Sequence, residues 1–275
     1  MDDMSGSHPD IIAGYPMPTA IAGLGYKAVL DLNKDFGKNA FRFLGASAIV
    51  HSHSMQDGHP KNPVVGTDGT KGAPIIDEFK ARAVMSIVIA LEDLADDPYS
   101  APTDQEVAES FSVRVPGWFF GGGKVFVPEG KPPASLVAVS GPDRMEECLR
   151  MLPPGFVLLD RRDLLEAQLE TSSDPLDGLL DLLELTPSDE QQGGAKADTP
   201  RFRRAHPGWL VPLLVGYQGI ETPTQRSSAR IKDGTTPHLY AESLYSVGEY
   251  KSLRALLATR GPDALESSLW SHRRH

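Results

Sequence analysis

A glycine-rich stretch, WFFGGGKVFVPEG, runs from Trp118 to Gly130 and is the first candidate for ligand chemistry. Three glycines precede Lys124, and aromatic and β-branched residues frame them. Glycine allows unusual backbone conformations and lets N–H groups approach a ligand closely, so such a turn can cradle a phosphate. The alternative interpretation is a plain hairpin turn that binds nothing.

Neither of two common nucleotide-binding motifs is present in this stretch. A P-loop requires Ser or Thr after its lysine, whereas Val125 follows Lys124. A dinucleotide-binding fingerprint opens a helix, whereas these glycines are expected to open a strand. We therefore expect no nucleotide, and no cofactor is assigned.

A second candidate is the histidine-rich stretch HSHSMQDGHP, which contains His51, His53 and His59. Alternating histidines in a strand would place two imidazoles on one face. No carboxylate or cysteine completes a familiar metal-binding spacing, so a polar loop is the favoured interpretation and no metal is assigned. No catalytic constellation is evident, and we expect that the chain is not an enzyme. A metal-dependent nuclease that uses His51 and His53 is the weakest alternative.

Basic residues are spread over expected loops and strand edges, interleaved with Phe202, Trp209 and Tyr217. Guanidinium groups bind phosphates bidentately and aromatic faces stack on bases, although a solvated surface is an equally good interpretation. Tyr217 and Trp209 are both stacking candidates, and the core is the favoured position for Trp209. The basic residues are Lys61, Lys71, Lys80, Arg82, Lys124, Arg201, Arg203, Arg204, Arg226, Arg230 and Lys232.

Composition limits the class of protein. The chain has 275 residues, a net charge of -10 and a single cysteine, Cys148, so no intramolecular disulfide can form. No apolar run reaches the roughly 18 residues of a membrane span, and no secretory signal is evident, so a cytoplasmic protein is expected. The negative charge argues against nucleic-acid binding without partners.

The hydrophobic pattern predicts a mixture of helices and strands. Thr19 is expected to cap a helix that ends near Leu32, and Thr103 with Glu106 forms a capping-box pattern. Pro212 indicates an edge strand or a bulge. Strands are expected at 41–50, 83–91, 113–115, 118–120, 125–127, 154–160 and 209–220. Helices are expected at 103–111, 142–152, 161–170 and 176–185, and in part of 237–258.

Several stretches together resemble one known family. They are GYPMPTAIAGLGYKAVL near the start, FFGGGKV, LPPGFVLLDRRDLLEAQLET at 152–171 followed by LDGLLDLLEL, HPGWLVPLLVGYQGI at 206–220, and TPHLYAESLYSVGEY at 236–250. In this order, they resemble the Csy-two (Cas-five) subunit of type I-F CRISPR surveillance complexes (Cascade), a member of the RAMP superfamily.

The resemblance implies an α+β fold with a ferredoxin-like (RRM-like) RAMP core, an antiparallel sheet and peripheral helices. We expect a single domain over 1–275, with 51–74 as a thumb-like loop insertion and 186–200 as a flexible linker. The family's first core strand looks shortened or absent, because only MDDMSGSHPDII precedes the first-helix region.

The resemblance further implies a non-catalytic, crRNA-binding subunit that caps the 5′ handle of the CRISPR RNA. It would contact the large subunit and the backbone subunit, and target DNA indirectly or at the PAM. One alternative is a PAM-reading subunit of a complex without a large subunit. Another is a protein-interaction module without RNA contact, which the acidic region 160–185 favours. The residues expected at RNA are Gly121, Gly122, Gly123, Lys124, Lys61, Asn62, Lys71, Arg82, Arg201, Arg203, Arg204, Tyr217 and Arg230.

Overall fold

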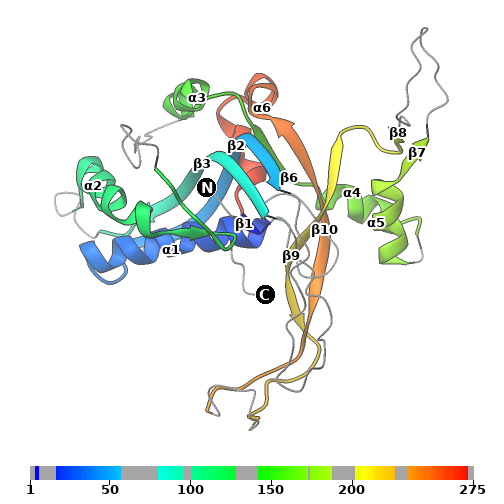
Figure 1. Cartoon of the computed structure of the whole chain (residues 1–275), viewed down its shortest axis with the longest axis horizontal. Coiled ribbons are helices and arrows are strands. Elements are labelled where there is room, and N and C mark those ends of the chain that lie inside the picture. The colour runs from blue at the N-terminus through cyan, green and yellow to red at the C-terminus, as the bar shows by residue number, and fades with distance from the viewer. Residues whose placement is uncertain are drawn as a thin grey trace, which may run out of the picture. The chain divides into compact units, whose positions relative to one another are not determined.

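The computed structural model describes residues 4–5, 17–56, 80–95, 101–127, 142–172, 174–187, 202–226 and 235–271 (Figure 1). The chain divides into two compact units. The first comprises Met1–Asp160 with Glu249–His275, and the second comprises Arg161–Gly248. The expectations of one domain over 1–275 and of a ferredoxin-like core stay predictions.

The first unit is built on an antiparallel sheet. Its strands are β1 (Met4–Ser5), β2 (Phe41–Gln56), β3 (Lys80–Asp93) and β6 (Phe156–Asp160), in the order β1-β3-β2-β6. The long β2–β3 pair runs from the Phe41↔Asp93 partners to the Gln56↔Lys80 partners, with two register shifts. The predicted strands at 41–50 and 83–91 are confirmed, and both extend further than expected.

Helix α1 (Pro18–Phe36) packs on β2 and supplies much of the core. Ile21, Leu24 and Ala28 are among its buried residues, and their helical spacing puts them on one face. The expectation that Thr19 caps this helix is wrong. Pro18 occupies the first turn, where its missing N–H costs nothing, and Met17 is the N-cap.

Helix α2 (Asp104–Arg114) begins with the predicted capping box. The Glu106 backbone N–H donates to Thr103 Oγ1 at 3.3 Å, and the Thr103 backbone N–H donates to Glu106 Oε2 at 2.8 Å. The strand expected at 113–115 is wrong, because α2 continues through Val113 and a 3-10 turn, η1 (Val115–Gly117), follows it. The capping-box pattern therefore predicted the start of the helix correctly but not its end.

Helices lie on both faces of the first unit's sheet (Figure 1). Ala48 of β2 belongs to the cluster with α1, whereas the next residue, Ile49, belongs to a second cluster. Neighbouring strand residues point to opposite faces, which explains this division. The second cluster draws on α3 (Pro142–Met151), α6 (Leu253–Arg260), η2 (Gly261–Ser268) and β6.

The second unit combines two short helices with two strand pairs. The helices are α4 (Arg162–Leu169) and α5 (Pro175–Leu183), and the strands β7 (Leu185–Pro187) and β8 (Phe202–Arg204) pair antiparallel. Strands β9 (Trp209–Gly219) and β10 (Ala241–Ser252) are neighbours, and β10 belongs to this unit up to Gly248. A small core joins Leu179, Leu182, Leu210 and Val247.

Two expectations for this region have clear outcomes. Pro212 lies in β9, which is the last strand in the sheet order, so the predicted edge position is confirmed. The partly helical interpretation of 237–258 is wrong over 241–252, where β10 forms. Pairing with β9 outweighs the weak helical spacing, and the β-formers Tyr245, Val247 and Tyr250 suit a strand.

Two predicted loops fall largely outside the described residues. Of the expected insertion 51–74, residues 51–56 belong to β2, so that part of the loop expectation is wrong. Of the expected linker 186–200, residues 186–187 belong to β7. The remainder of both segments, 57–74 and 188–200, is not described.

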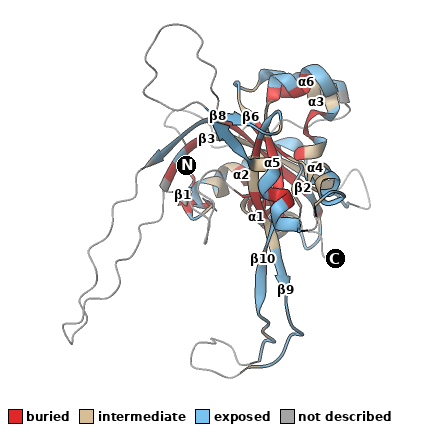
Figure 2. Ribbon diagram, turned by 90° about the vertical axis from the view of Figure 1, so that its right-hand side faces the viewer, coloured by how far each residue is buried: buried red, intermediate tan, exposed pale blue. Residues whose placement is uncertain are grey.

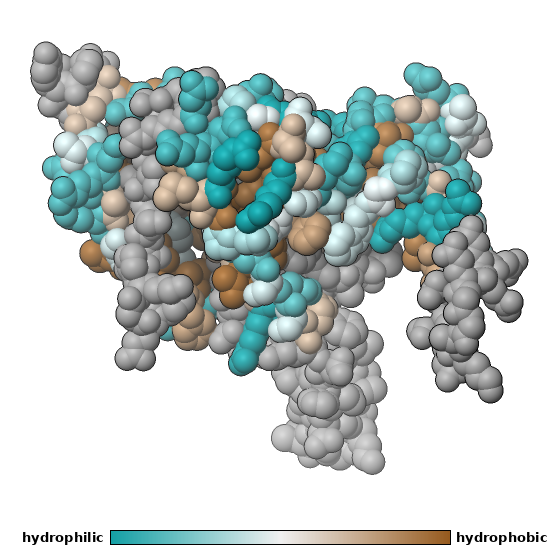
Figure 3. Space-filling view, turned by 90° about the horizontal axis from the view of Figure 1, so that it is seen from above, coloured by the Kyte–Doolittle hydropathy of each residue, from teal (hydrophilic) through white to brown (hydrophobic). Residues whose placement is uncertain are grey.

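The surface mixes hydrophilic and hydrophobic side chains. Seen from above, brown side chains show between the teal ones in the part that is not grey (Figure 3). In Figure 2, buried residues gather around the helices and sheet, whereas the lower parts of β9 and β10 are exposed. Over the described part of the chain, no helix has the length and apolar character needed to cross a membrane.

Candidate nucleic-acid interface

The glycine-rich stretch forms a tight two-stranded hairpin, as predicted, but the strand expected at 125–127 is wrong, because the second strand is formed by Gly123 and Lys124. Strand β4 (Phe119–Phe120) pairs antiparallel with β5 (Gly123–Lys124), in the register Phe119↔Lys124 and Phe120↔Gly123. The two turn residues have positive φ values, +54° at Gly121 and +80° at Gly122. Two successive positive φ values fit the primed turns of tight hairpins, which strongly favour glycine.

The turn itself is open. A Cβ atom added at Gly121 or at Gly122 would meet no atom within 4 Å. The glycines are therefore required by backbone conformation and not by crowding inside the protein. This leaves room for an external group to approach the backbone, with the exposed Lys124 next to the turn.

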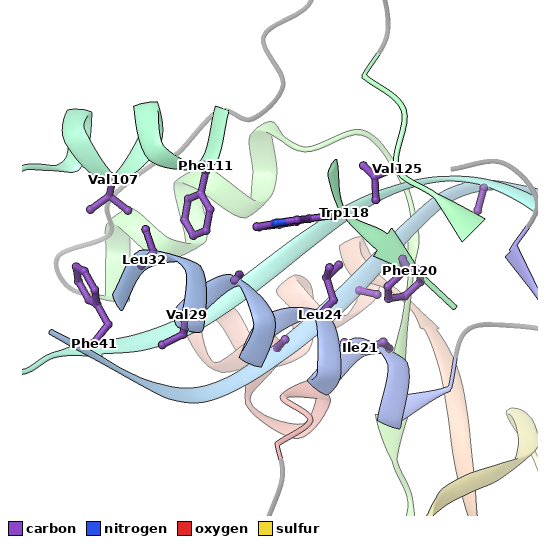
Figure 4. Close-up of a cluster of buried hydrophobic side chains, with 14 of the residues drawn as sticks. Ile21, Leu24, Val29, Leu32, Phe41, Val107, Phe111, Trp118, Phe120 and Val125 are labelled. Carbon is purple, nitrogen blue, oxygen red and sulfur yellow. The ribbon is translucent and has the colours of Figure 1, made fainter. Parts of the chain in front are cut away.

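One face of the hairpin is anchored in the core of the first unit. Trp118 and Phe120 are buried, at 8% and 1% exposure, and Val125 lies beside them in the same cluster. Figure 4 shows these side chains on the side of the hairpin that faces α1. The Trp118 ring also meets the Phe111 ring of α2 edge-on, with centroids 5.7 Å apart. The hairpin is thus held by apolar packing against α1 and α2.

A buried carboxylate adds a polar anchor. Trp118 Nε1 donates to Asp31 Oδ2 at 3.2 Å, and Lys34 Nζ donates to Asp31 Oδ1 at 2.9 Å. Lys27 Nζ also donates to Asp31. Burial is the largest single influence on the pKa of Asp31 and raises it, but the hydrogen bonds from Lys27, Lys34 and Trp118 together leave this pKa lowered. Asp31 therefore stays charged and orients the indole.

The neighbouring Asp35 connects α1 to α2. Arg114 Nε donates to Asp35 Oδ2 at 2.9 Å, and Ser110 Oγ donates to the same oxygen at 2.6 Å. The hydrogen bond from Arg114 is the main reason that the pKa of Asp35 is lowered. These contacts fix α2 on α1 and so fix the position of Phe111 under Trp118.

The other face of the hairpin carries Lys124 together with two phenylalanines that the sequence reasoning did not single out. Phe119 is 66% exposed and Phe126 is 55% exposed, and Lys124 is exposed as well. The Lys124 ammonium lies 5.9 Å from the centre of the Phe126 ring. The sequence feature that indicates their exposure is the alternation of side chains between the two faces of a strand. With Trp118 and Phe120 directed inward, Phe119 must point outward.

The structure places the remaining predicted residues on separate elements. Arg82 is exposed on β3 in the first unit. In the second unit, Arg203 and Arg204 are exposed on β8, and Tyr217 is 59% exposed on β9. Gly121, Gly122, Gly123 and Lys124 lie together in the β4–β5 hairpin, and the other predicted residues that the structure describes lie on β3, β8 and β9. Lys61, Asn62, Lys71, Arg201 and Arg230 lie outside the described residues.

Two details of the second unit refine these expectations. Arg204 Nη1 donates to the Leu210 carbonyl at 3.0 Å, so one edge of this guanidinium already has a structural contact. Trp209, expected in the core, is 50% exposed, and that expectation is wrong. It occupies the first position of the edge strand β9, where one side of the strand has no strand beside it in the sheet order.

The histidines of β2 take part in structural contacts. The two ring nitrogens of His51 lie 3.0 Å from the Pro154 carbonyl and 2.8 Å from Ser86 Oγ, which ties β2 to β3 and to the loop before β6. Burial lowers the pKa of His53, which favours its neutral form. His59 lies outside the described residues. Within the described ranges, no three His, Cys, Asp or Glu side chains are grouped to hold a metal ion.

Comparison with known proteins identifies the class. The family described as "CRISPR-associated protein (Cas_Csy2)" matches residues 7–274, which is nearly the whole chain. The chain therefore belongs to this family of CRISPR-associated proteins, a family of the type I-F Cascade systems. A curated relative, the "CRISPR-associated protein Csy2" of Pseudomonas aeruginosa (strain UCBPP-PA14), is 27% identical over 295 residues. The match covers 94% of this chain and 84% of that protein.

Proposed function

We propose that the chain is a non-catalytic Cascade subunit that binds and caps the 5′ handle of the crRNA. In this role it joins the large subunit to the backbone filament for RNA-guided DNA targeting. The observation that carries the proposal is the exposed glycine turn of the β4–β5 hairpin, anchored on its inner face and open at its tip. Family membership supplies the biological setting.

The turn suits a phosphate for physical reasons. Side chains are absent at Gly121 and Gly122, so a phosphate oxygen can reach the backbone N–H groups. The exposed ammonium of Lys124 adds a positive charge one residue beyond the turn. Hydrogen bonds from a charged donor to phosphate are shorter and stronger than neutral ones.

Partner subunits are part of the proposal, because the chain's own charge is unfavourable. A net charge of -10 repels a polyanion at long range. Local basic residues, such as Arg203 and Arg204 on β8, offset this only in part. We therefore expect useful RNA affinity in the assembled complex and weak affinity for the isolated chain.

The test is co-purification of the tagged chain with the products of its neighbouring genes, followed by sequencing of the RNA and ultraviolet crosslinking. We expect repeat-derived RNAs with a uniform 5′ end, crosslinked to this subunit. Lys124→Gln should reduce the slope of log affinity against log salt by about 0.7, the loss of one contact to a single-stranded phosphate. Arg254→Gln, at an exposed site on α6, is the control of equal charge.

Recovery of the assembled complex with no RNA crosslinked to this chain would overturn the proposal. The same result would favour a second candidate, a protein-interaction module without RNA contact. Helix α5 supports that candidate, because it exposes Leu176 and Leu180 at 60% and 55% beside Asp177 and Asp181. The PAM-reading role stays an alternative and is tested by crosslinking of target DNA to the same subunit.

A further inference from the structure

The outer face of the β4–β5 hairpin has an unusual composition for a surface. Inward residues of this segment are buried, whereas Phe119, Lys124 and Phe126 all point outward. Phe119 and Lys124 are direct partners in the register. The Val125 backbone N–H donates to the Trp118 carbonyl at 3.0 Å, which continues the ladder one pair further and keeps Phe126 on the outer side.

The exposure of these two rings is not explained by the chain's own core. Trp118, Phe120 and Val125 already fill the inner face, so Phe119 and Phe126 add nothing to that packing. Water-exposed phenyl rings forgo the free energy that burial would provide. A ligand that covers the rings would recover it, which makes this face a candidate contact surface.

The position of Lys124 indicates the kind of ligand. Its ammonium lies within 6 Å of the Phe126 ring centre, at 5.9 Å, and its backbone pairs with that of Phe119. Aromatic rings interleaved with a cation are typical of surfaces that bind single-stranded nucleic acid, where bases stack on the rings and the cation meets the phosphates. A protein-docking patch would not require a lysine between its two rings.

The hairpin is also preorganised. Its turn is set by two positive-φ glycines, and its inner side is fixed by the hydrogen bond from Trp118 to Asp31. Little conformational freedom of the backbone would therefore be lost when a ligand binds. A rigid platform suits stacking, because a planar base gains most from a ring that is already in place.

We propose that Phe119 and Phe126, with Lys124 between them, form a stacking platform for unpaired bases of single-stranded RNA. The platform rests on the proposed function, and it adds a second mode of contact. The glycine turn meets phosphates through the backbone, whereas the outer face meets bases through aromatic side chains. Unpaired bases are required, because bases within a duplex present no free face.

The experiment uses the assembled complex with its co-purified RNA. Crosslinked residues are mapped by mass spectrometry, and RNA retention is measured against salt for Phe119→Ala, Phe126→Ala, and the Leu and Tyr variants of both positions. We expect crosslinks at Phe119 or Phe126 and a loss of roughly 5- to 100-fold in affinity for each Ala variant. Leu should restore little and Tyr most of the binding, because only Tyr retains an aromatic face.

A matched control separates stacking from surface damage. Val113→Ala truncates an 81% exposed apolar side chain on α2, and it should leave RNA retention unchanged. The thermal midpoints of all variants should match that of the unmodified complex, since the substituted residues are exposed. If the thermal midpoint instead falls in both the Ala and the Leu variants, in proportion to their loss of RNA, the assignment is overturned.

The remaining outcomes distinguish the two proposals. Full RNA retention by the Leu variants, or loss of a partner subunit with RNA binding intact, would overturn the platform and point to protein docking. RNA crosslinked to this chain at other residues, with the phenylalanine variants unchanged, would overturn the platform alone. An unmodified complex with no RNA on this chain would overturn the proposed function, and the platform with it.

Discussion

The core around α1 and the β9–β10 hairpin use similar residues in opposite ways. In the first, Ile21 and Phe120 are each 1% exposed and pack in one cluster. In the second, Tyr217, Ile220 and Tyr240 are 59%, 62% and 63% exposed. Hydrophobic residue type alone does not separate these two regions. What separates them is whether another helix or strand packs against these residues.

The difference extends to what holds each region together. The far part of the β9–β10 hairpin depends on backbone hydrogen bonds, including Ile220 N–H to the Tyr240 carbonyl at 3.0 Å and the reciprocal pair between Thr224 and His238. An isolated two-stranded hairpin is marginally stable in water. We infer that this segment is locally the less stable region, and that its apolar residues are available to a partner.

The largest expected effect lies in the core. Phe120→Ala should lower the free energy of unfolding by about 3–5 kcal/mol, because it removes a fully buried ring and leaves a cavity. Phe119→Ala, one residue away and 66% exposed, is the matched control and should change stability by less than about 0.5 kcal/mol. Urea denaturation measures both. Equal effects would mean that the two faces of the β4–β5 hairpin are not as different as described.

A pair of glycines in α1 gives the next effect, with opposite signs. A Cβ at Gly25 would lie 2.7 Å from Ala46 Cβ of β2, so Gly25→Ala forces the helix away from the sheet and should destabilise by about 1–3 kcal/mol. A Cβ at Gly23 meets nothing within 4 Å, so Gly23→Ala should stabilise by about 0.5–1 kcal/mol through helix propensity. Thermal unfolding of both variants checks the sign. Two changes of the same sign would contradict close packing at Gly25.

Local sequence signals predicted where helices and turns form, but they did not predict which other parts of the chain pack against them. The Thr103–Glu106 capping box and the Gly121–Gly122 turn were both predicted, since each depends on chemistry within a few residues. The partly helical interpretation of 237–258 holds for 253–258, which lie in α6, and is wrong over 241–252, because pairing with β9 is a long-range contact that periodicity does not show. Trp209 was placed in the core by residue type, but it occupies an edge strand.

The candidate site was predicted in part for the same reason. The glycines and Lys124 were found because they are adjacent in sequence. Phe119 and Phe126 were missed as exposed residues because exposure depends on which face of the hairpin meets α1. The buried Asp31, which orients Trp118 from 87 positions away in the chain, carries no local sequence signal.

Asp31 gives a smaller, pH-dependent effect in the core. Its pKa is lowered in the folded chain, so its contribution to stability is complete above its ordinary pKa of 3.8 and is lost as the pH falls through the folded value. Asp31→Asn should cost about 1 kcal/mol at pH 7, since Lys27 and Lys34 are more than half exposed. Denaturation at pH 7, 5 and 3 should show the gap to wild type narrowing at pH 3. A gap independent of pH would exclude the charge of Asp31 as its source.

The smallest effect is expected in the β9–β10 hairpin. The Arg226 guanidinium lies 4.4 Å from the centre of the Tyr240 ring, an exposed cation–π contact worth about 0.5–1 kcal/mol. Tyr240→Leu keeps apolar area but removes the π face, so it should change global stability by less than about 1 kcal/mol. Backbone hydrogen exchange should be fast near Ile220 and Thr224 in the wild type and in Tyr240→Leu, because opening there does not require the core to unfold. If those amides exchange as slowly as those of α1, the hairpin is as stable as the core. That result would contradict the inference that its exposed apolar residues are available to a partner.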